Sequence, residues 1–220
     1  MAGVIIPIGG SEDKTGDMSV LKRVLAEAPG NRVHIITTAT EYPEDAKKRY
    51  EDAFALLGIQ DIEVSYINSR AEANDEGLAQ KIGEADVIFM SGGSQLRLTH
   101  MLGGTAVLKA IRQANDKGSV IAGTSAGAAC MPGLMLYGGL VENSYKKGNL
   151  HAAAGFGFVP NAVIDTHFSQ RGRLPRLFSM VSTSRATIGI GLDESYKKTF
   201  DCVGTYFDVL LFIQLGSAYS

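Results

Sequence analysis

Residues 118–129 of the chain read Gly118-Ser119-Val120-Ile121-Ala122-Gly123-Thr124-Ser125-Ala126-Gly127-Ala128-Ala129. An apolar run followed by small residues predicts a buried strand, a sharp turn and then a helix. Ser125 lies at the turn, in a Gly-x-Ser-x-Gly pattern whose glycines let the backbone bend without a Cβ clash. The N-terminus of the following helix directs free N–H groups at the same point. The pattern alone is a weak signal, but in this context it favours a serine nucleophile with oxyanion donors beside it.

Length and composition limit the classes of protein to consider. The 220 residues are enough for one large α/β domain, and 45% hydrophobic with 20% charged residues is an ordinary globular composition. The formal net charge of −2 gives no reason to expect a nucleic acid or an anionic membrane as partner. Two cysteines, Cys130 and Cys202, do not make a disulfide framework. No secretory signal or membrane-spanning run is visible, so a cytoplasmic location is the default expectation.

Strands and helices are expected to alternate along the first part of the chain. The predicted strands cover residues 4–8, 33–38, 62–67, 87–90 and the run before Gly123, and the predicted helices cover 18–28, 43–57, 76–82, a segment from about 95, and 105–117. Asp17 is the expected cap of the first helix, and Pro7 suggests an edge position for the first strand. This alternation predicts an α/β fold, a mostly parallel sheet with helices on both faces. Ligands of such sheets bind beyond the carboxyl ends of the strands.

Polar residues follow two further predicted strands in the second half of the chain. Residues 137–160 are rich in Gly, Asn and Ala and are expected to form loops or a hairpin near the site. His167 follows a predicted strand at 162–165, and Asp193 with Glu194 follows another at 186–192. A serine, a histidine and an acid at strand ends match a nucleophile, a general base and a group that orients the base. A plainer interpretation of His167 is a polar residue that caps a strand.

The remaining histidines suggest no second site. His34 lies within a predicted strand and is expected as a core or face residue, whereas His100 and His151 are expected on a helix surface and in a loop. No cluster of His, Cys, Asp and Glu has zinc-like spacing, so we expect neither a metal nor another cofactor. The order serine, histidine, acid differs from the serine, acid, histidine order of α/β-hydrolases.

Five segments of the chain together resemble a known family. They are Ile8-Gly9-Gly10-Ser11-Glu12-Asp13-Lys14, Gly92-Gly93-Ser94-Gln95, Gly123-Thr124-Ser125-Ala126-Gly127-Ala128, Asp165-Thr166-His167-Phe168 with Arg171, Arg173 and Arg176, and Gly189-Ile190-Gly191-Leu192-Asp193-Glu194. The chain resembles the cyanophycinases, serine exopeptidases of the peptidase E-like group, from about residue 3 to Glu194. The resemblance implies a fold like that of class I glutamine amidotransferases, in a single α/β peptidase domain over residues 1–220. It also implies a homodimer.

The resemblance further implies an activity. Cyanophycinases hydrolyse cyanophycin, a poly-aspartate with an arginine on each side-chain β-carboxyl, to β-Asp-Arg dipeptides through an acyl-enzyme. The implied roles are nucleophile for Ser125, base for His167, orienting acid for Glu194 in preference to Asp193, and oxyanion donors for the backbone N–H groups of Gly93 and Ala126. Gly-x-Ser-x-Gly does not distinguish families, whereas the arginine-rich segment after the histidine is specific.

Six residues fall at substrate-pocket positions of the family. They are Gln95, Asp165, Thr166, Arg171, Arg173 and Arg176. Arginine forks bind carboxylates in a bidentate manner, which suits the free carboxylates of a β-Asp-Arg end. Asp165 is a candidate partner for the guanidinium of the substrate, and Arg176 is alternatively a helix-surface residue that pairs with nearby acids. Thr166 stands where the family usually has glutamine.

The end of the chain departs from the family pattern. Residues 195–220 resemble none of the strands with which the family continues, so we expect an atypical tail, truncated or frame-altered, in which 209–213 can form one strand. Two alternatives therefore remain beside cyanophycin hydrolysis. One is an aspartyl dipeptidase with the same three residues and a smaller pocket. The other is a non-catalytic relative that binds cyanophycin without turning it over.

Overall fold

The computed structural model describes residues 3–139, 149–183, 188–194 and 209–214, the last of these as backbone only. Five strands form a parallel sheet in the order β1-β5-β4-β2-β3. They are β1 (Ile5–Ile8), β2 (Arg32–Ile36), β3 (Asp61–Ser65), β4 (Val87–Met90) and β5 (Val120–Thr124). All five were expected, and β1 is the edge strand that Pro7 suggested, since an edge tolerates a missing N–H.

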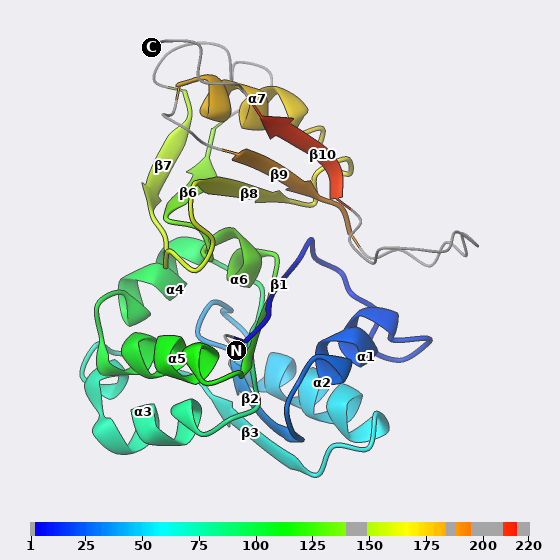
Figure 1. The fold of residues 1–220 in the computed structure, drawn as a ribbon, viewed down its shortest axis with the longest axis vertical. Helices are drawn as coiled ribbons and strands as arrows, with labels where there is room; N and C mark the ends of the chain where they lie inside the picture. Colours follow the sequence, from blue (N-terminus) through cyan, green and yellow to red (C-terminus); the bar gives the residue numbers. More distant parts are fainter. Residues whose placement is uncertain (1–2, 140–148, 184–187, 195–208, 215–220) are drawn as a thin grey trace.

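Helices cover both faces of this sheet, as the alternation predicted (Figure 1). One face carries α1 (Ser19–Ala26) and α2 (Pro43–Leu56), and the other carries α3 (Glu76–Gly83), α4 (Gln95–Leu102) and α5 (Ala106–Asp116), with the short η1 (Glu72–Asn74) beside α3. Residues alternate along each strand between two cores. Phe89 packs with α1 and α2, whereas its neighbours Ile88 and Met90 pack with α3, α4 and α5.

The start of α1 differs from the expectation. Met18, with φ 49°, occupies the N-cap position, and no side chain caps the helix there. Asp17 instead pairs with Lys22 at 3.6 Å. The carboxylate of Asp13 accepts hydrogen bonds from the backbone N–H groups of Gly16, Thr15 and Met18, which lower the pKa of Asp13 to about 2. A local turn therefore takes the place of the cap.

A smaller set of strands lies beyond the edge of the main sheet. In it β8 (Ala162–Thr166) runs parallel to β9 (Ile188–Leu192), and β10 (Val209–Gln214), the strand expected at 209–213, is antiparallel to β9. The helix α7 (Leu174–Thr183) packs on this sheet through Leu177 and Val181. Strands β6 (Leu134–Gly138) and β7 (His151–Ala154) form an antiparallel pair, which confirms the hairpin expected near residues 137–160. The rest of the segment after 194 lies outside the described residues.

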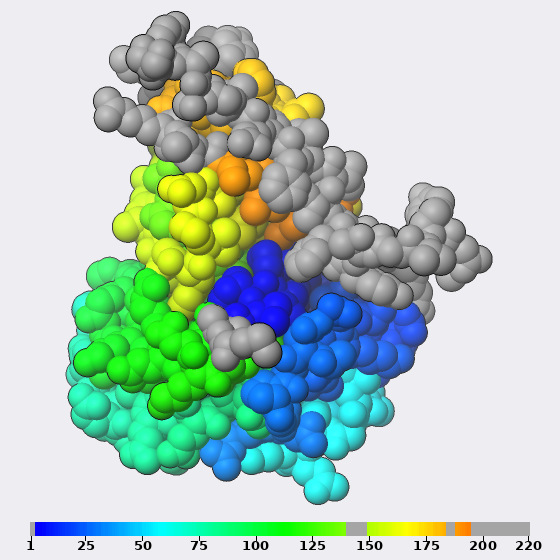
Figure 2. Space-filling model, viewed as in Figure 1, coloured from blue at the N-terminus to red at the C-terminus, as the bar shows by residue number. Residues whose placement is uncertain are grey.

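The carboxyl end of β1 joins the two main sheets. The carbonyl of Ile8 accepts a hydrogen bond from the N–H of Ser125, and the carbonyl of Gly9 accepts one from the N–H of His167, both at 2.9 Å. The short helix α6 (Ala126–Ala129) packs against Ile164 of β8 and Leu192 of β9. In Figure 2 the dark-blue start of the chain lies where the yellow part meets the green and light-blue part.

No helix within the described ranges is long and apolar enough to cross a lipid bilayer.

Candidate active site

Ser125 lies at the junction of β5 and α6, in the strand–turn–helix arrangement that its surrounding residues predicted. Its backbone has φ 51° and ψ −106°, a conformation that is uncommon for a residue with a side chain. Strain of this kind persists only where neighbouring structure enforces it. The hydrogen bond from the Ser125 N–H to Ile8 is one such constraint.

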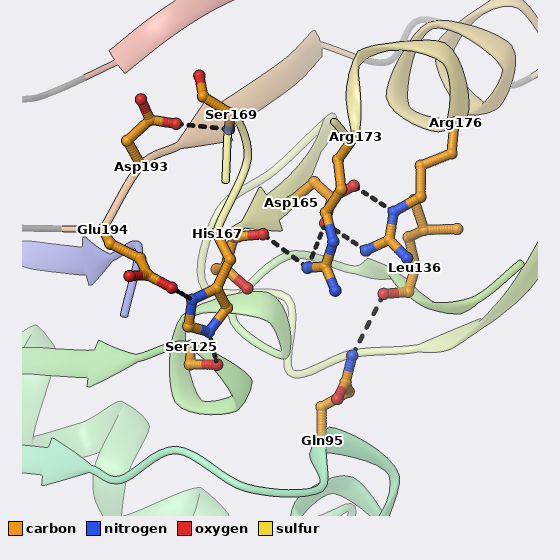
Figure 3. Close-up of polar contacts among 11 residues, drawn as sticks. Gln95, Ser125, Leu136, Asp165, His167, Ser169, Arg173, Arg176, Asp193 and Glu194 are labelled. Carbon is orange, nitrogen blue, oxygen red and sulfur yellow. Dashed lines mark hydrogen bonds and ion pairs between the residues drawn. The ribbon is translucent and has the colours of Figure 1, made fainter. Parts of the chain in front are cut away.

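His167 connects Ser125 to an acid. The Oγ of Ser125 lies 2.8 Å from Nε2 of His167, and Nδ1 of His167 lies 2.6 Å from Oε1 of Glu194 (Figure 3). The ring is 8% exposed, so these contacts are sheltered from solvent. A carboxylate only accepts hydrogen bonds, so it favours the tautomer with the proton on Nδ1 and leaves Nε2 free to accept from the serine hydroxyl.

The two adjacent acids after β9 face different partners. Oδ1 of Asp193 accepts a hydrogen bond from the N–H of Ser169 at 2.7 Å, whereas the side chain of Glu194 reaches the imidazole. The N–H of Glu194 donates to Oε1 of Gln170 at 3.2 Å. The loop after His167 is therefore tied to both acids, and the geometry selects Glu194 as the partner of the ring.

The turn after β4 brings a second backbone segment beside Ser125. A Cβ atom placed on Gly92 would lie 3.4 Å from Cβ of Ser125. Gly93 has φ +139° and packs so closely against the chain that a Cβ there would lie 2.1 Å from the carbonyl oxygen of Ala39. Within the described part of the chain, the N–H groups of Gly93 and Ala126 donate to no backbone carbonyl, so both are available to a ligand.

Asp165 forms a buried cluster with two arginines. Arg176 binds it in a bidentate manner, from Nε to Oδ2 at 2.6 Å and from Nη2 to Oδ1 at 2.5 Å. Arg173 donates from Nη1 to Oδ1 of Asp165 at 3.0 Å and to the carbonyl of Thr166 at 2.6 Å. Burial lowers the pKa of Arg173 to about 10, with Asp165 opposing that effect.

This cluster changes the interpretation of two predicted substrate contacts. Asp165 is 2% exposed and its carboxylate already binds arginines of its own chain, so the geometry does not favour it as the partner of a substrate guanidinium. Arg176 pairs with a nearby acid, as the alternative interpretation held, although it is buried rather than on a solvated helix face.

The other predicted substrate residues are less tightly held. Arg171 is exposed, and its side chain makes no hydrogen bond or ion pair with the described residues. Gln95 begins α4 and donates from Nε2 to the carbonyl of Leu136 at 3.4 Å. Thr166 is buried at the end of β8, beside Asp165 in the sequence. Figure 3 shows the side chains of Gln95 and Arg173 in the same close-up as His167.

Comparison with known proteins identifies the family of the chain. Residues 5–197 match the model of the family described as peptidase family S51. The chain belongs to peptidase family S51. A cyanophycinase from Geminocystis herdmanii is 35% identical to this chain over 193 residues, which cover 86% of the chain and 71% of the relative. Cyanophycinases from Synechococcus elongatus and Thermosynechococcus vestitus are each 32% identical over 206 residues, covering 92% of the chain; the chain spans 64% of their length.

Solved structures support the fold of the chain. A peptidase from an acI-B1 actinobacterium superposes with a TM-score of 0.70 at 21% identity, covering 88% of this chain and 81% of that one. A protein named as a peptidase E from Listeria monocytogenes superposes with a TM-score of 0.55 at 19% identity, covering 77% and 81%. These neighbours confirm the α/β fold.

Sequence reasoning missed one residue of the site. Gly10 follows β1 with φ +120°, and a Cβ atom there would lie 2.2 Å from Cε1 of His167. Only glycine therefore leaves room for the imidazole in its observed place. The available signal was the pair Gly9-Gly10 directly after the first strand, a position where the chain of an α/β protein approaches a ligand or a catalytic group.

The other histidines of the chain lie away from the site. His34 is buried in β2, with Nε2 2.8 Å from Oγ of Ser65, and burial lowers its pKa to about 4. His100 is exposed on α4, and His151 is exposed in β7 rather than in a loop. Among the residues that the structure describes, no three of His, Cys, Asp and Glu are grouped as a metal site requires.

Proposed function

We propose that this chain is a serine-type exopeptidase that hydrolyses cyanophycin to β-Asp-Arg dipeptides through an acyl-enzyme. The observation that carries the chemistry is the continuous chain of contacts from Ser125 through His167 to Glu194. The choice of substrate is supported by relatives named as cyanophycinases and by the arginines that follow His167.

Acylation follows from the positions of these groups. Oγ of Ser125 attacks the scissile carbonyl carbon while Nε2 of His167 takes the hydroxyl proton. Glu194 holds the ring in the required tautomer and stabilises the imidazolium that forms. The backbone N–H groups of Gly93 and Ala126 are proposed to bind the oxygen that becomes negative. The imidazolium then returns its proton to the leaving amine, and an ester to Ser125 remains.

Deacylation uses the same residues in reverse. A water molecule attacks the ester carbonyl, and Nε2 of His167 takes one of its protons. The tetrahedral intermediate collapses, the proton passes to Oγ of Ser125, and the product carboxylate leaves. Every proton that His167 takes is thus returned within one cycle.

Substrate recognition is assigned to the less constrained polar groups. Arg173 donates to Asp165 and Thr166 through Nη1 alone, and Arg171 is exposed. Both arginines can therefore donate from their remaining guanidinium nitrogens to the carboxylates of a β-Asp-Arg end. Asp165 and Arg176 are proposed to orient Arg173 instead of touching the substrate. Gln95 and Thr166 stay predicted contacts, and the homodimer stays a prediction.

The test is incubation of the purified chain with cyanophycin, with release of β-Asp-Arg followed by mass spectrometry. Ser125→Ala is the control, and we expect the parent to release the dipeptide and the variant to release none. Faster turnover of short aspartyl dipeptides than of the polymer would assign the chain to the aspartyl dipeptidases. Binding of the polymer by a folded parent chain, with no product of either kind, would contradict a peptidase role altogether.

A further inference from the structure

A second buried carboxylate lies behind the nucleophile. Glu12, in the segment between β1 and α1, is 4% exposed. Its Oε2 accepts a hydrogen bond from Oγ1 of Thr124 at 2.5 Å, and its Oε1 accepts one from the hydroxyl of Tyr50 at 2.6 Å. Lys14 lies 2.7 Å from the same Oε1. Three elements far apart in the sequence therefore converge on one carboxylate.

The partners of Glu12 satisfy both oxygens of its buried carboxyl group. A buried carboxylate is costly unless donors and an opposite charge surround it, and this one has two hydroxyl donors and an ammonium group. Burial, together with the neighbouring charge of Glu12, raises the pKa of Tyr50 well above its usual value, so the phenol stays protonated and donates. Lys14 lies 4.9 Å from the centre of the Tyr50 ring and closes the cluster on its outer side.

The cluster is connected to Ser125 through a single peptide bond. Thr124 is the last residue of β5 and the direct neighbour of Ser125, whose strained backbone needs support. The same β1–α1 segment also contacts the site through its backbone, because Ile8 binds the N–H of Ser125 and Gly9 binds the N–H of His167. Residues 8–12 thus contact the nucleophile side and the base side of the site together.

We propose that Glu12 is a positioning residue, which holds Thr124 by its hydroxyl and so fixes Oγ of Ser125 at hydrogen-bond distance from His167. This inference rests on the proposed serine-peptidase function. Glu12 is buried behind the turn, so it acts through Thr124 and does not touch the substrate. Loss of the contact therefore lowers the rate of the chemical step and leaves substrate binding unchanged.

A pair of matched variants separates positioning from general stability. Thr124→Val and Tyr50→Phe each remove one hydroxyl donor from Glu12, but only Thr124 adjoins Ser125. We expect Thr124→Val to lower kcat by about tenfold or more with KM unchanged, because small displacements of reacting groups are costly. Tyr50→Phe is expected to keep kcat within about threefold of the parent. Thr124→Ser retains the hydroxyl and is expected to restore kcat.

The experiment measures kcat and KM on cyanophycin and the rate of labelling of Ser125 by a serine-directed phosphonate, which needs no polymer. We expect Thr124→Val and Glu12→Gln to slow labelling by the same factor as kcat. Ser65→Ala, which removes a buried hydrogen bond to His34 away from the site, is expected to label at the parent rate. Circular dichroism identifies variants that fail to fold. If Thr124→Val does not fold, the labelling rate of Glu12→Gln tests the positioning role in its place.

The outcomes distinguish this inference from the proposed function. A parent chain that the phosphonate does not label overturns the serine-peptidase function and the role of Glu12 with it. A labelled parent that does not turn over cyanophycin overturns the substrate alone, and labelling rates then decide the role of Glu12. Folded Thr124→Val and Glu12→Gln chains that label as fast as the parent overturn the positioning role alone. Equal losses of kcat and of labelling rate in Tyr50→Phe and Thr124→Val would show that the cluster has only a structural role.

Discussion

The five-stranded sheet and the β8–β9 sheet contribute different halves of the site by different means. The first fixes the backbone of Ser125 sterically, with a strained φ of 51° and a glycine turn after β4 packed beside it, while Glu12 acts on Ser125 only indirectly through Thr124. The second holds His167 and Arg173 by their contacts with carboxylates, those of Glu194 and Asp165. Sterically fixed positions are sensitive to added atoms, whereas charge-fixed positions are sensitive to the loss of one charge.

Loss of the acid beside His167 is expected to have the largest effect on activity. Glu194→Gln keeps the shape of the side chain, but its amide can donate to Nδ1 and so place the ring proton on Nε2, where it cannot accept from Ser125. We expect kcat to fall by about 10⁴-fold, as in other triads with the wrong tautomer. Steady-state hydrolysis of cyanophycin measures this.

The neighbouring acid provides the control. Asp193→Asn keeps an oxygen that can accept from the N–H of Ser169, and Asp193 does not contact the imidazole. It is expected to retain kcat within about threefold of the parent, since only an exposed hydrogen bond is altered. Similar losses in the two variants would show that the geometry does not assign the orienting role to Glu194.

The next largest effect is expected at the other carboxylate of the β8–β9 half. Asp165→Asn leaves Arg173 and Arg176 buried without their charge partner, which should cost about 3–5 kcal/mol of the free energy of unfolding. Urea denaturation measures the loss. Asp52→Asn, which removes the acid of an exposed pair with Lys48, is expected to cost less than about 1 kcal/mol. Equal losses would mean that the buried cluster contributes no more than a surface pair.

The two halves also differed in how far the sequence predicted them. Strands of the five-stranded sheet are short apolar runs followed by turns, so the run before Ser125 and the glycines at 92 and 93 were recognisable from local pattern. The partner of each charged group is not local. Asp165 meets Arg176 across 11 residues and Glu12 meets Thr124 across 112, and no periodicity specifies such pairs.

The resemblance to a family supplied what the pattern could not. It identified Glu194 rather than Asp193 as the acid nearest His167, and the structure brings these two side chains together. It did not show that Arg173 and Arg176 both bind Asp165, or that Arg176 is buried there, because neither feature is visible in a local motif. The local pattern also predicted Asp17 as the cap of α1. In the structure, the carboxylate of Asp13, four residues earlier, accepts the hydrogen bonds from the backbone N–H groups of Gly16 and Met18.

Gly10 offers a test at the point where the two halves meet. Gly10→Ala places a methyl group on the imidazole of His167 at a φ of +120°, which alanine also disfavours. We expect kcat to fall by about 100-fold through displacement of the ring. Gly104→Ala is the control. Gly104 has φ +72° with nothing within 4 Å of the added atom, so this variant tests backbone strain alone. Equal activity in both variants would contradict a steric role for Gly10.

The smallest expected effect compares the two buried histidines, one in each half. Among the residues that the structure describes, His34 in β2 contacts Ser65 and no carboxylate. Burial, with a smaller effect of Lys81, lowers the pKa of His34 from 6.5 to about 4. Because the folded-state pKa lies below the unfolded one, the unfolded chain binds the extra proton between these values. The contribution of His34 is therefore complete above pH 6.5 and is lost as the pH falls toward about 4.

The expected size of this loss is modest. Between about pH 7.5 and about pH 5, the protonation of His34 in the unfolded chain should remove about 2 kcal/mol of the free energy of unfolding. Urea denaturation of the parent and of His34→Gln at both pH values isolates it, because all other titrating groups are common to the two chains. The parent should lose about 2 kcal/mol more than the variant on acidification. If the parent and His34→Gln lost equal amounts of unfolding free energy, His34 would be protonated in the folded chain at the lower pH. A buried histidine of the five-stranded sheet would then hold a proton without a carboxylate partner.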